Sequence, residues 1–449
     1  MEYAKYPSAL QRIAFLSALL ITPGAVAAGG FQIFEQSVKG LGQAFAGSAA
    51  SADDAATVFF NPAGMTQLPG SRIQAAANII ATRADFVNEG SVTGTGQPLQ
   101  GSAADGGILT AVWNGYVTHA LNNRVFVGFG VNTPFGLRTD YPRSWIGRYH
   151  AVDSDLRTLN LSPVVAIRLH DSLSIGVGID VQYVDVLLSN AIDFGAFLAP
   201  SGRTSPGSDD GFQEIKADDW GLGYNLGLLF TPNENTRIGV AFRSGIDLTL
   251  RGEAKFEKSA NVERALAATG FSSLFRNTGV RATATLPGTL SVGAYQRLNS
   301  RWALLAGLSW TRWDSLEDPI SIRFDNPDQP LQTLSLNYNN AFRYSVGANY
   351  YASERLTLRS GIAYDETPIP DAASRIAGLP DADRFWLAAG LTYAVTKNLF
   401  IDFAYAHLFI DDAEIQNTLS SAVPRLQSQL TGRFEGAANI ISAQVGWRF

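Results

Sequence analysis

A strict alternation of apolar and polar side chains constrains this chain more than any other feature of its sequence. Between Leu173 and Tyr183 every second residue is large and apolar or aromatic, and the residues between them are small or polar. This period of two is that of a β-strand with one apolar face. The same pattern recurs in residues 302–310, 385–393 and 399–406. The chain is therefore expected to be all-β.

The first 27 residues predict export. Lys5 and Arg12 precede an apolar core, and a small-residue site follows, as in a secretory signal peptide that is cut after Ala27 or Ala28. The rest of the chain has no run of about 18 apolar residues, which a transmembrane helix would need. If the exported protein lies in a membrane, it must therefore cross it as a β-barrel. The chain contains no cysteine, so disulfides and thiol chemistry are excluded.

Two tryptophans favour a lipid-facing band. Trp302 and Trp310 bracket one apolar strand face. They lie about eight residues apart, which corresponds to roughly 27 Å along a strand. A tilted strand of that length fits an apolar belt between two aromatic girdles, as in a transmembrane barrel.

The connections between the strand-like segments give an independent strand count. Six short polar turns alternate with seven long connections, and thirteen connections join fourteen strands. An even number with both chain ends on the short-turn side is the arrangement of an outer-membrane barrel, with the long loops outside. The short turns lie at Asn122-Asn123, His170-Asp171, Asn233-Glu234-Asn235, Asn299-Ser300, Ser353-Glu354 and Lys397-Asn398. The long connections lie near 85–107, 136–155, 188–219, 252–280, 314–337, 365–383 and 411–435.

Composition and motifs give little support to catalysis or to nucleic-acid binding. The net charge of −6 is modest and argues against a nucleic-acid partner. The four histidines, His119, His150, His170 and His407, lack the spacing of a metal site. The sequence has no Gly-x-Ser-x-Gly elbow, and its Gly-x-Gly pairs lie inside strands. We therefore expect no enzyme activity, no cofactor and no metal.

The segment between the signal peptide and the first strand has a different character. It combines an Ala/Gly-rich stretch, an acidic pair at Asp53-Asp54 and the turn Asn61-Pro62-Ala63-Gly64-Met65. In this order, these pieces resemble the N-terminal plug of the FadL family, the outer-membrane channels that carry long-chain fatty acids and other hydrophobic compounds. The resemblance continues through Trp145, residues 147–150, residues 359–368 and residues 380–384.

The resemblance implies a fourteen-stranded antiparallel barrel with a plug in its lumen. It divides the chain into a signal peptide at 1–27, a plug at 28–69 and a transmembrane β-barrel at 70–449. The alternating last strand, which ends at Phe449, resembles the signal read by the barrel assembly machinery. The implied place is the outer membrane of a Gram-negative bacterium, where lipid and lipopolysaccharide would surround a monomer.

Five plug residues are candidates for specific roles. Asn61, Pro62 and Gly64 are expected to fix a turn in the plug. Phe59 and Phe60 are expected to supply apolar contact area, also for substrate. The alternative is an ordinary turn that follows a short strand.

Two long outer connections carry apolar residues whose exposure to water would be unfavourable. Phe194 and Phe197 lie in the first, and Leu266 and Phe271 lie in the second, where the spacing of Val262 and Leu266 predicts a short amphipathic helix. In FadL-like proteins the corresponding outer loops form a hydrophobic groove that captures substrate. The alternative is that these side chains only pack the loops together.

A carboxylate substrate would need a cation. Arg148 lies beside Trp145 and Tyr149 in the connection between the third and fourth strands. Its guanidinium could bind a carboxylate bidentately while the aromatic rings hold the chain. The alternative is a solvated loop arginine or a contact with lipopolysaccharide.

Prolines and glycines predict a part of the barrel wall that has few ladder hydrogen bonds and small side chains. Proline cannot donate a ladder hydrogen bond, and Pro134 and Pro163 lie in or near neighbouring strands. Counting from the turns places Pro163 roughly opposite Gly130, and Gly128 lies beside it. In the family, a kink in the third strand opens a lateral portal, so we expect the portal at Gly128, Gly130, Pro134 and Pro163. The alternative is a harmless bulge.

The sequence as a whole predicts a FadL-like channel for the passive uptake of hydrophobic molecules, with long-chain fatty acids as the first candidate. Outer-loop capture, plug gating and lateral exit are implied by the resemblance. Three different functions stay open: a channel for aromatic or alkane hydrocarbons, a general porin, and an outer-membrane lipid-modifying enzyme.

Overall fold

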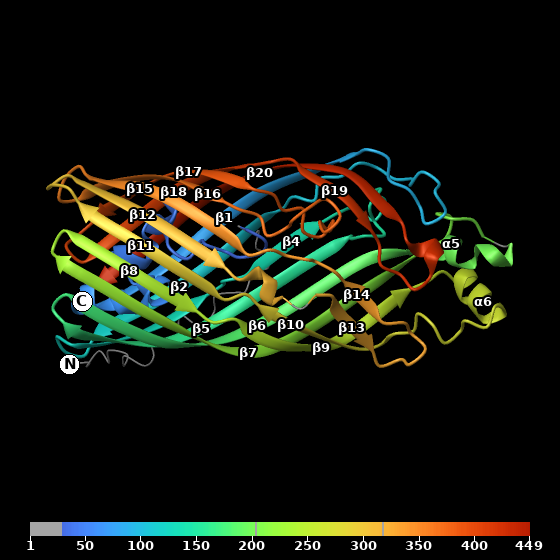
Figure 1. Ribbon diagram of the computed structural model, residues 1–449, viewed down its shortest axis with the longest axis horizontal. Coiled ribbons are helices and arrows are strands. Elements are labelled where there is room, and N and C mark those ends of the chain that lie inside the picture. Colours follow the sequence, from blue (N-terminus) through green and yellow to red (C-terminus); the bar gives the residue numbers. More distant parts are fainter. Residues whose placement is uncertain (1–28, 203, 317) are drawn as a thin grey trace, which may run out of the picture.

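The chain forms a long β-barrel whose C-terminus lies at one end and whose helices α5 (Phe194–Leu198) and α6 (Ala260–Ala268) lie at the other (Figure 1). The computed structural model describes residues 29–202, 204–316 and 318–449. The signal peptide predicted at 1–27 lies outside the described residues.

In the described residues, twenty strands form one antiparallel sheet. They are β1 (Ser71–Asn88), β2 (Leu109–Ala120), β3 (Val125–Asn132), β4 (Gly136–Asp140), β5 (Asp153–His170), β6 (Leu173–Asp193), β7 (Asp210–Asn233), β8 (Thr236–Arg243), β9 (Ile246–Glu257), β10 (Thr278–Leu286), β11 (Thr289–Arg297), β12 (Trp302–Thr311), β13 (Ile320–Phe324), β14 (Gln332–Leu334), β15 (Ala341–Tyr351), β16 (Leu356–Asp365), β17 (Arg384–Ala394), β18 (Leu399–Ile410), β19 (Ala413–Thr418) and β20 (Gln429–Arg448).

The sheet closes into a barrel of fourteen spans. β3 with β4, β8 with β9, β10 with β11, and β18 with β19 are single spans interrupted by short irregular segments, and β13 pairs with β14 as a hairpin beyond β12. β1 and β20 pair from Arg72 opposite Arg448 to Asn88 opposite Gly432, which closes the wall. The prediction of a closed fourteen-stranded antiparallel barrel is confirmed.

The outer face of the barrel is apolar, as the alternation predicted. Val177 and Ile179 of β6 are more than half exposed, whereas Gly176, Gly178 and Asp180 between them are buried. Trp302 and Leu304 of β12 likewise face outward. An outward row of large apolar side chains suits hydrocarbon around the barrel, and the inner face is left to small and polar residues.

Several strands extend further than predicted. Half of the connection expected at 188–219 is strand, because β6 continues to Asp193 and β7 begins at Asp210. The outward side chains of this part of β7 are Glu214, Lys216 and Asp218, with Trp220 next along the strand. Charged outward residues suit water, so the apolar alternation ends at Trp220 although the backbone pairing continues. Hydropathy therefore marked the apolar belt and not the ends of the strands.

Residues 29–68 lie inside the barrel, near the end that holds the C-terminus (Figure 1). This segment contains the short helices α2 (Val38–Leu41), α3 (Ser48–Ser51), α4 (Thr57–Phe60) and η2 (Pro62–Gln67). No helix in the described ranges is long and apolar enough to cross a membrane. Nearly all side chains of the segment are buried against the inner faces of the strands.

Wall glycines let the inner segment approach the strands closely. A Cβ atom on any of them would meet backbone or side-chain atoms of residues 42–65, so a larger residue would push the segment away from the wall. These positions are Gly128, Gly176, Gly227, Gly239, Gly293, Gly307, Gly347, Gly361 and Gly390.

Three short helical turns lie in the outer connections. They are η3 (Ala199–Ser201), η4 (Trp313–Ser315) and η5 (Pro424–Leu426). The amphipathic helix expected after Phe256 is α6, and Val262 and Leu266 are among its buried residues. Ser259 caps its N-terminus by accepting a hydrogen bond from the Val262 amide.

Candidate functional site

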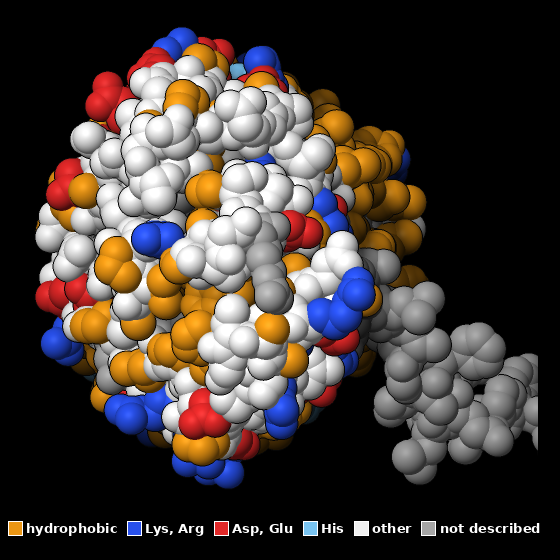
Figure 2. Space-filling view, turned by 90° about the vertical axis from the view of Figure 1, so that its right-hand side faces the viewer, with side chains coloured by type: hydrophobic (Ala, Val, Ile, Leu, Met, Phe, Trp, Pro, Cys, Tyr) orange, Lys and Arg blue, Asp and Glu red, His pale blue; other side chains and the backbone are white. Residues whose placement is uncertain are grey.

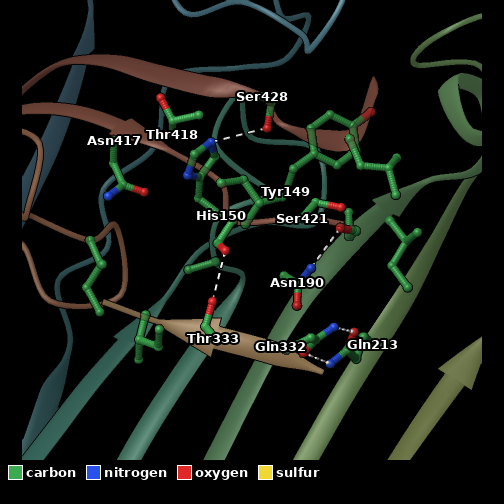
Figure 3. Close-up of a pocket in the computed structure, with 18 of the residues that line it drawn as sticks. Tyr149, His150, Asn190, Gln213, Gln332, Thr333, Asn417, Thr418, Ser421 and Ser428 are labelled. Carbon is green, nitrogen blue, oxygen red and sulfur yellow. Dashed lines mark hydrogen bonds between the residues drawn. The ribbon is translucent and has the colours of Figure 1, made fainter. Parts of the chain in front are cut away.

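A cavity of about 440 Å³ lies under the outer loops. Its lining comes from the outer ends of β6 and β7 and from the connections at 93–99, 149–154, 322–337, 373–378 and 417–428. We call this cavity the outer pocket (Figure 3). Figure 2 faces this end of the molecule and shows hydrophobic side chains in its middle with charged ones around the edge. The volume is that of a site for a small organic molecule.

One side of the outer pocket is apolar. Ile192, Phe197 and Ile215 line it together with Leu274 and Phe275. These residues belong to a buried apolar cluster that joins α5 to α6. The two outer connections that were predicted to bind substrate therefore do build one wall of the pocket.

The predicted residues divide between lining the pocket and packing the loops. Phe197 lines the pocket, and its ring lies 5.2 Å from Phe271 and 5.4 Å from Phe275. Phe194 is completely buried, with its ring 4.9 Å from Phe275. Leu266 is a buried residue of α6, and Phe271 is exposed at the loop surface. Phe194, Leu266 and Phe271 thus position Phe197 and Phe275 without lining the cavity.

Neutral polar groups lie among the other lining residues of the pocket (Figure 3). Gln213 of β7 and Gln332 of β14 exchange two hydrogen bonds of 2.8 and 2.9 Å between their side-chain amides. Ser428 lies 3.2 Å from Nε2 of His150. Burial lowers the pKa of His150 to about 4, so its ring is neutral at ordinary pH.

The guanidinium of Arg148 is hydrogen-bonded to neighbouring residues of the protein. Its Nε donates to Asp210 at 2.7 Å, and Nη1 donates to the Gln100 carbonyl. Its Nη2 bonds to the Tyr149 hydroxyl, which in turn donates to Asp210 at 2.8 Å. Burial and the nearby carboxylates raise the pKa of Tyr149. These bonds use the guanidinium donors that a substrate carboxylate would need.

Trp145 and Tyr149 differ in their positions. Trp145 is completely buried and stacks on Tyr141 with ring centroids 4.0 Å apart, while its indole N–H donates to the Ala151 carbonyl. It holds the loop together and does not line the pocket. Tyr149 does line the pocket.

A loss of Arg148 should loosen the outer loops rather than change charge recognition. Arg148→Ala would leave Asp210 without its guanidinium at a mostly buried place, at a cost of about 2 kcal/mol of local stability. Amide exchange of residues 145–152 should then accelerate roughly thirty-fold. The matched control is Arg143→Ala, because its ion pair with Glu257 is solvent-exposed and is expected to contribute little. Equal exchange in the two variants would show that Arg148 does not hold this loop.

The predicted plug turn is firmly bonded. Asn61 accepts from the Ala63 amide at 3.0 Å and donates to the carbonyls of Ala49 and Leu228, so it joins the plug to β7. Pro62 begins η2, and a Cβ on Gly64 would collide with Thr57. Residues 29–68, which fill the lumen in this way, are called the plug below.

Phe59 and Phe60 pack within the plug and against the barrel. Phe60 lies 5.9 Å from Phe45 between ring centroids, and the Arg243 guanidinium lies 4.3 Å from the Phe59 ring. Neither residue lines the outer pocket, so their role in substrate binding stays a prediction.

The wall has a gap beside the third strand. β2 pairs with β3 only from Gly115 to Ala120, and the ladder between β4 and β5 starts again at Gly136. In the described residues, the backbone ladder of residues 109–114 of β2 is with β1, and the ladder with β3 ends at Gly115. We call this interruption between residues 109–114 and 136–140 the β2–β4 slit. A small cavity of about 60 Å³ lies at its outer end.

Plug residues cover the inner side of the slit. The Ile33 amide donates to the Pro134 carbonyl and the Gly136 amide donates to the Phe31 carbonyl, both at 2.9 Å. Gln36 donates to the Thr133 carbonyl at 2.7 Å. The kink at Pro134 therefore turns its backbone groups from β2 to the plug.

The lateral portal predicted at Gly128, Gly130, Pro134 and Pro163 stays a prediction. The ladder between β5 and β6 skips Ser162 and Pro163. Pro163 lies opposite Phe129, one residue from the predicted partner, and the ladder between β3 and β5 is continuous there. Gly130 faces the lumen, where a Cβ would lie 3.0 Å from the Tyr116 ring and 3.1 Å from Val58 of the plug. Gly128 likewise faces Val58 and Met65. Plug atoms fill the space that these glycines leave, so the interruption lies on the β2 side of Pro134.

A charged row that sequence reasoning missed crosses the inner wall. Arg343, Asp365 and Arg384 lie directly opposite one another on β15, β16 and β17, and all are buried. The Arg343 guanidinium lies 4.6 Å from the Phe34 ring of the plug, and Asp381 accepts from the Gly30 amide at 2.8 Å. The signal in the sequence was the inward position of these charges in otherwise alternating strands.

The sequence profile of the family described as outer membrane protein transport protein (OMPP1/FadL/TodX) matches residues 19–449. The chain belongs to this family. A putative outer membrane protein of Neisseria meningitidis serogroup B is 31% identical over 468 residues, which cover 99% of each chain. The long-chain fatty acid transport protein of Escherichia coli K12 is 29% identical over 403 residues, which cover 84% of this chain and 87% of that relative. The FadL resemblance and the outer-membrane location are confirmed.

Solved structures agree with the barrel. A Pseudomonas aeruginosa FadL homologue superposes with a TM-score of 0.85 at 23% identity and covers 94% of this chain and 100% of that chain. The Ralstonia pickettii toluene transporter TbuX superposes with a TM-score of 0.65 at 19% identity, over 93% of this chain and 100% of that chain. At these identities the likeness shows the fold. The protein is thus an outer-membrane transporter of hydrophobic compounds with the FadL-type barrel.

Proposed function

We propose that this protein takes up long-chain hydrophobic molecules, with fatty acids as the first candidate. The molecule would enter the outer pocket, pass between plug and wall, and leave sideways through the β2–β4 slit. Three observations carry the proposal: a partly apolar pocket under the loops, the burial of residues 29–68 inside the barrel, and a wall gap whose inner side contacts residues 31–36.

The physical need for such a path is clear. The lipopolysaccharide layer resists apolar solutes, so a protein has to shield them while they cross it. Burying a fatty chain gains about 0.8 kcal/mol per CH₂, which gives affinity without an energy source. The same gain opposes release, so a conformational change in the plug would be needed to free the molecule.

The choice of fatty acids rests on the relatives. The Escherichia coli relative is named for long-chain fatty acid transport and aligns over most of both chains. The toluene transporter of similar fold supports a second candidate, which is the uptake of aromatic hydrocarbons. An apolar pocket suits both classes, so competition between labelled oleate and toluene for uptake separates them.

A general porin and a lipid-modifying enzyme would make different demands on the chain. A general porin needs an open polar lumen, whereas the described lumen is filled by the plug. Single-channel conductance of the intact protein would reveal a porin. An outer-membrane lipid hydrolase or acyltransferase would turn over phospholipid, which the purified protein can be tested for directly.

Filling the outer pocket should stop uptake. Ser421 lines the cavity from the connection at 417–428, and Ser421→Trp would place an indole in the space that a ligand needs. Uptake of labelled oleate in cells should fall by about tenfold at matched expression. The control is Ser272→Trp, because Ser272 is exposed in the α6 connection and does not line the pocket. Normal uptake in the Ser421→Trp variant would remove the outer pocket from the path.

A further inference from the structure

The charge of the outer pocket is unusual for a site that would bind a carboxylate. Of the described residues that line it, only His150, Asp193 and Arg425 carry an ionisable group other than the phenol of Tyr149. Each of the three lies in a different part of the lining. None of them offers a buried cation.

His150 is a neutral hydrogen-bonding group. It is half-buried, contacts Ser428, and has its pKa lowered to about 4 by burial of the ring. A ring with this pKa is almost entirely uncharged at pH 5 and above. It can donate or accept one hydrogen bond at a ring nitrogen but cannot neutralise an anion.

Asp193 has the wrong sign for a carboxylate ligand. It caps α5 by accepting from the Ala196 amide at 2.8 Å, and it accepts from the Gly207 amide at 2.9 Å. Burial raises its pKa, but these backbone donors favour the charged form. A second carboxylate close by would be repelled.

The cations around the pocket are bonded to protein acceptors or lie in water. Arg375, buried between two lining residues, donates to the carbonyls of Asp381 and Glu414. Arg148 lies behind the wall in its ion pair with Asp210, and Arg143 is bonded to Glu257 at the surface. Arg425 is exposed in η5 at the rim, where solvent screens its charge. Asp153, behind Ser189, adds a further negative group.

The polar groups that do face the cavity are amides and hydroxyls. Gln213 and Gln332 bond to each other, and Asn190, Asn417 and Ser428 lie around them (Figure 3). Amides offer donors and acceptors in equal measure, which matches a hydroxyl, an ester or a protonated carboxyl group. A carboxylate offers acceptors only, and burying it without a cation costs several kcal/mol.

We infer that the outer pocket binds its ligand with an uncharged, hydrogen-bonding head group on a long apolar chain, and that it discriminates against the carboxylate form. Long-chain alcohols, esters and protonated fatty acids belong to this class. The inference rests on the proposed function, because it assumes that the outer pocket is the capture site. Fatty acids would then enter in their protonated form.

The test uses two ligands that differ in charge but not in chain length. Binding of labelled 1-decanol and labelled decanoic acid to the purified full-length protein in detergent is measured by equilibrium dialysis at pH 5 and pH 7. The affinity for 1-decanol should be the same at both values. The apparent affinity for decanoic acid should fall on the order of fifty-fold from pH 5 to pH 7, since the uncharged fraction of a carboxyl group falls by about that factor.

Variants identify where the head group lies. Gln332→Lys would put an ammonium into the pocket and should raise the affinity for decanoate at pH 7 by about tenfold, whereas Gln332→Met of similar length should not. The Arg425→Ala variant tests whether the cation at the rim holds the head group. Decanoate binding within about threefold of 1-decanol at pH 7, or its selective loss in Arg425→Ala, would overturn the inference in favour of an anionic head at the rim.

The same experiment separates this inference from the proposed function. If 1-decanol does not bind, or binds equally to the Ser421→Trp variant, the outer pocket is not the capture site and both proposals fail. If Ser421→Trp abolishes binding of both ligands but wild type binds decanoate and 1-decanol alike at pH 7, the capture site stands and the charge preference alone is refuted.

Discussion

Removal of residues 29–68 is expected to convert this barrel into a wide and unselective ion channel. The plug occupies the lumen beside the inner faces of the strands, and wall glycines such as Gly239, Gly361 and Gly390 leave no side chains to fill the space in its place. Barrels only slightly larger than this one hold an aqueous channel when nothing plugs them. Single-channel conductance in planar bilayers should therefore rise by at least an order of magnitude.

The same deletion should destabilise the barrel without unfolding it. In the described residues, four buried apolar clusters combine plug residues with side chains of the wall, including Trp386 with Phe45 and Tyr116 with Val58. Their loss should lower the temperature of heat modification, because large buried surfaces become exposed to water. The strand ladders and the lipid-facing surface stay intact, so the variant should still migrate as a folded barrel.

A control deletion tests whether the plug is the barrier. Removing α6 (260–268) takes away a helix that packs behind the lining of the outer pocket but leaves the plug untouched, and should change conductance little. If deletion of residues 29–68 left conductance unchanged while deletion of α6 raised it, inward-packed loops would be the barrier. The gating role of the plug would then be refuted.

The architecture was predictable because lipid imposes a simple rule on the wall. A residue that faces hydrocarbon has to be apolar, so outward positions such as Ile179 and Leu304 repeat with a period of two. The six short turns follow from the same alternation, since polar pairs such as Asn122-Asn123 interrupt it. Beyond the membrane the rule ends, which is why hydropathy predicts a loop where the outer parts of β6 and β7 lie.

The candidate site was harder to predict because its parts meet only through pairing across the barrel. Gln213 and Gln332 lie 119 positions apart and carry no local motif, yet they bond to each other at the pocket. Phe194 and Phe271 were chosen for their apolar character alone, and this character serves the packing of α5 and α6. The composition of a loop indicates that it is buried, but not which side chain lines a cavity.

The β2–β4 slit was hard to predict for a similar reason. Phe129 and Val131 are apolar and face outward, so the alternation already implied that Gly130 between them faces the lumen. What the sequence could not show was that the plug fills this space and that Pro134 bonds to Ile33. The proline in the sequence marks the kink at Pro134. The β2–β4 slit, however, lies where β2 loses its ladder partner, and the sequence does not show which strand this is.

Closing the β2–β4 slit is expected to abolish delivery of substrate while leaving capture intact. Leu109 of β2 is 72% exposed and marks one edge of the slit, and Arg138 of β4 lies at the opposite edge. If the register of β2 with β3 continued past Gly115, Leu109 would face Leu137, next to Arg138. The chain has no cysteine of its own, so Leu109→Cys combined with Arg138→Cys can be joined selectively by a bifunctional thiol reagent.

Joining the two strands should reduce oleate uptake to the background of cells without the protein, and a cleavable reagent should restore uptake on reduction. Ligand binding to the purified protein should not change, because neither residue lines the outer pocket. Each single cysteine variant, treated with the same reagent, controls for the modification itself. A joined barrel that still delivers oleate at the normal rate would rule out lateral exit, because a straight path past the plug into the periplasm does not depend on an opening between β2 and β4.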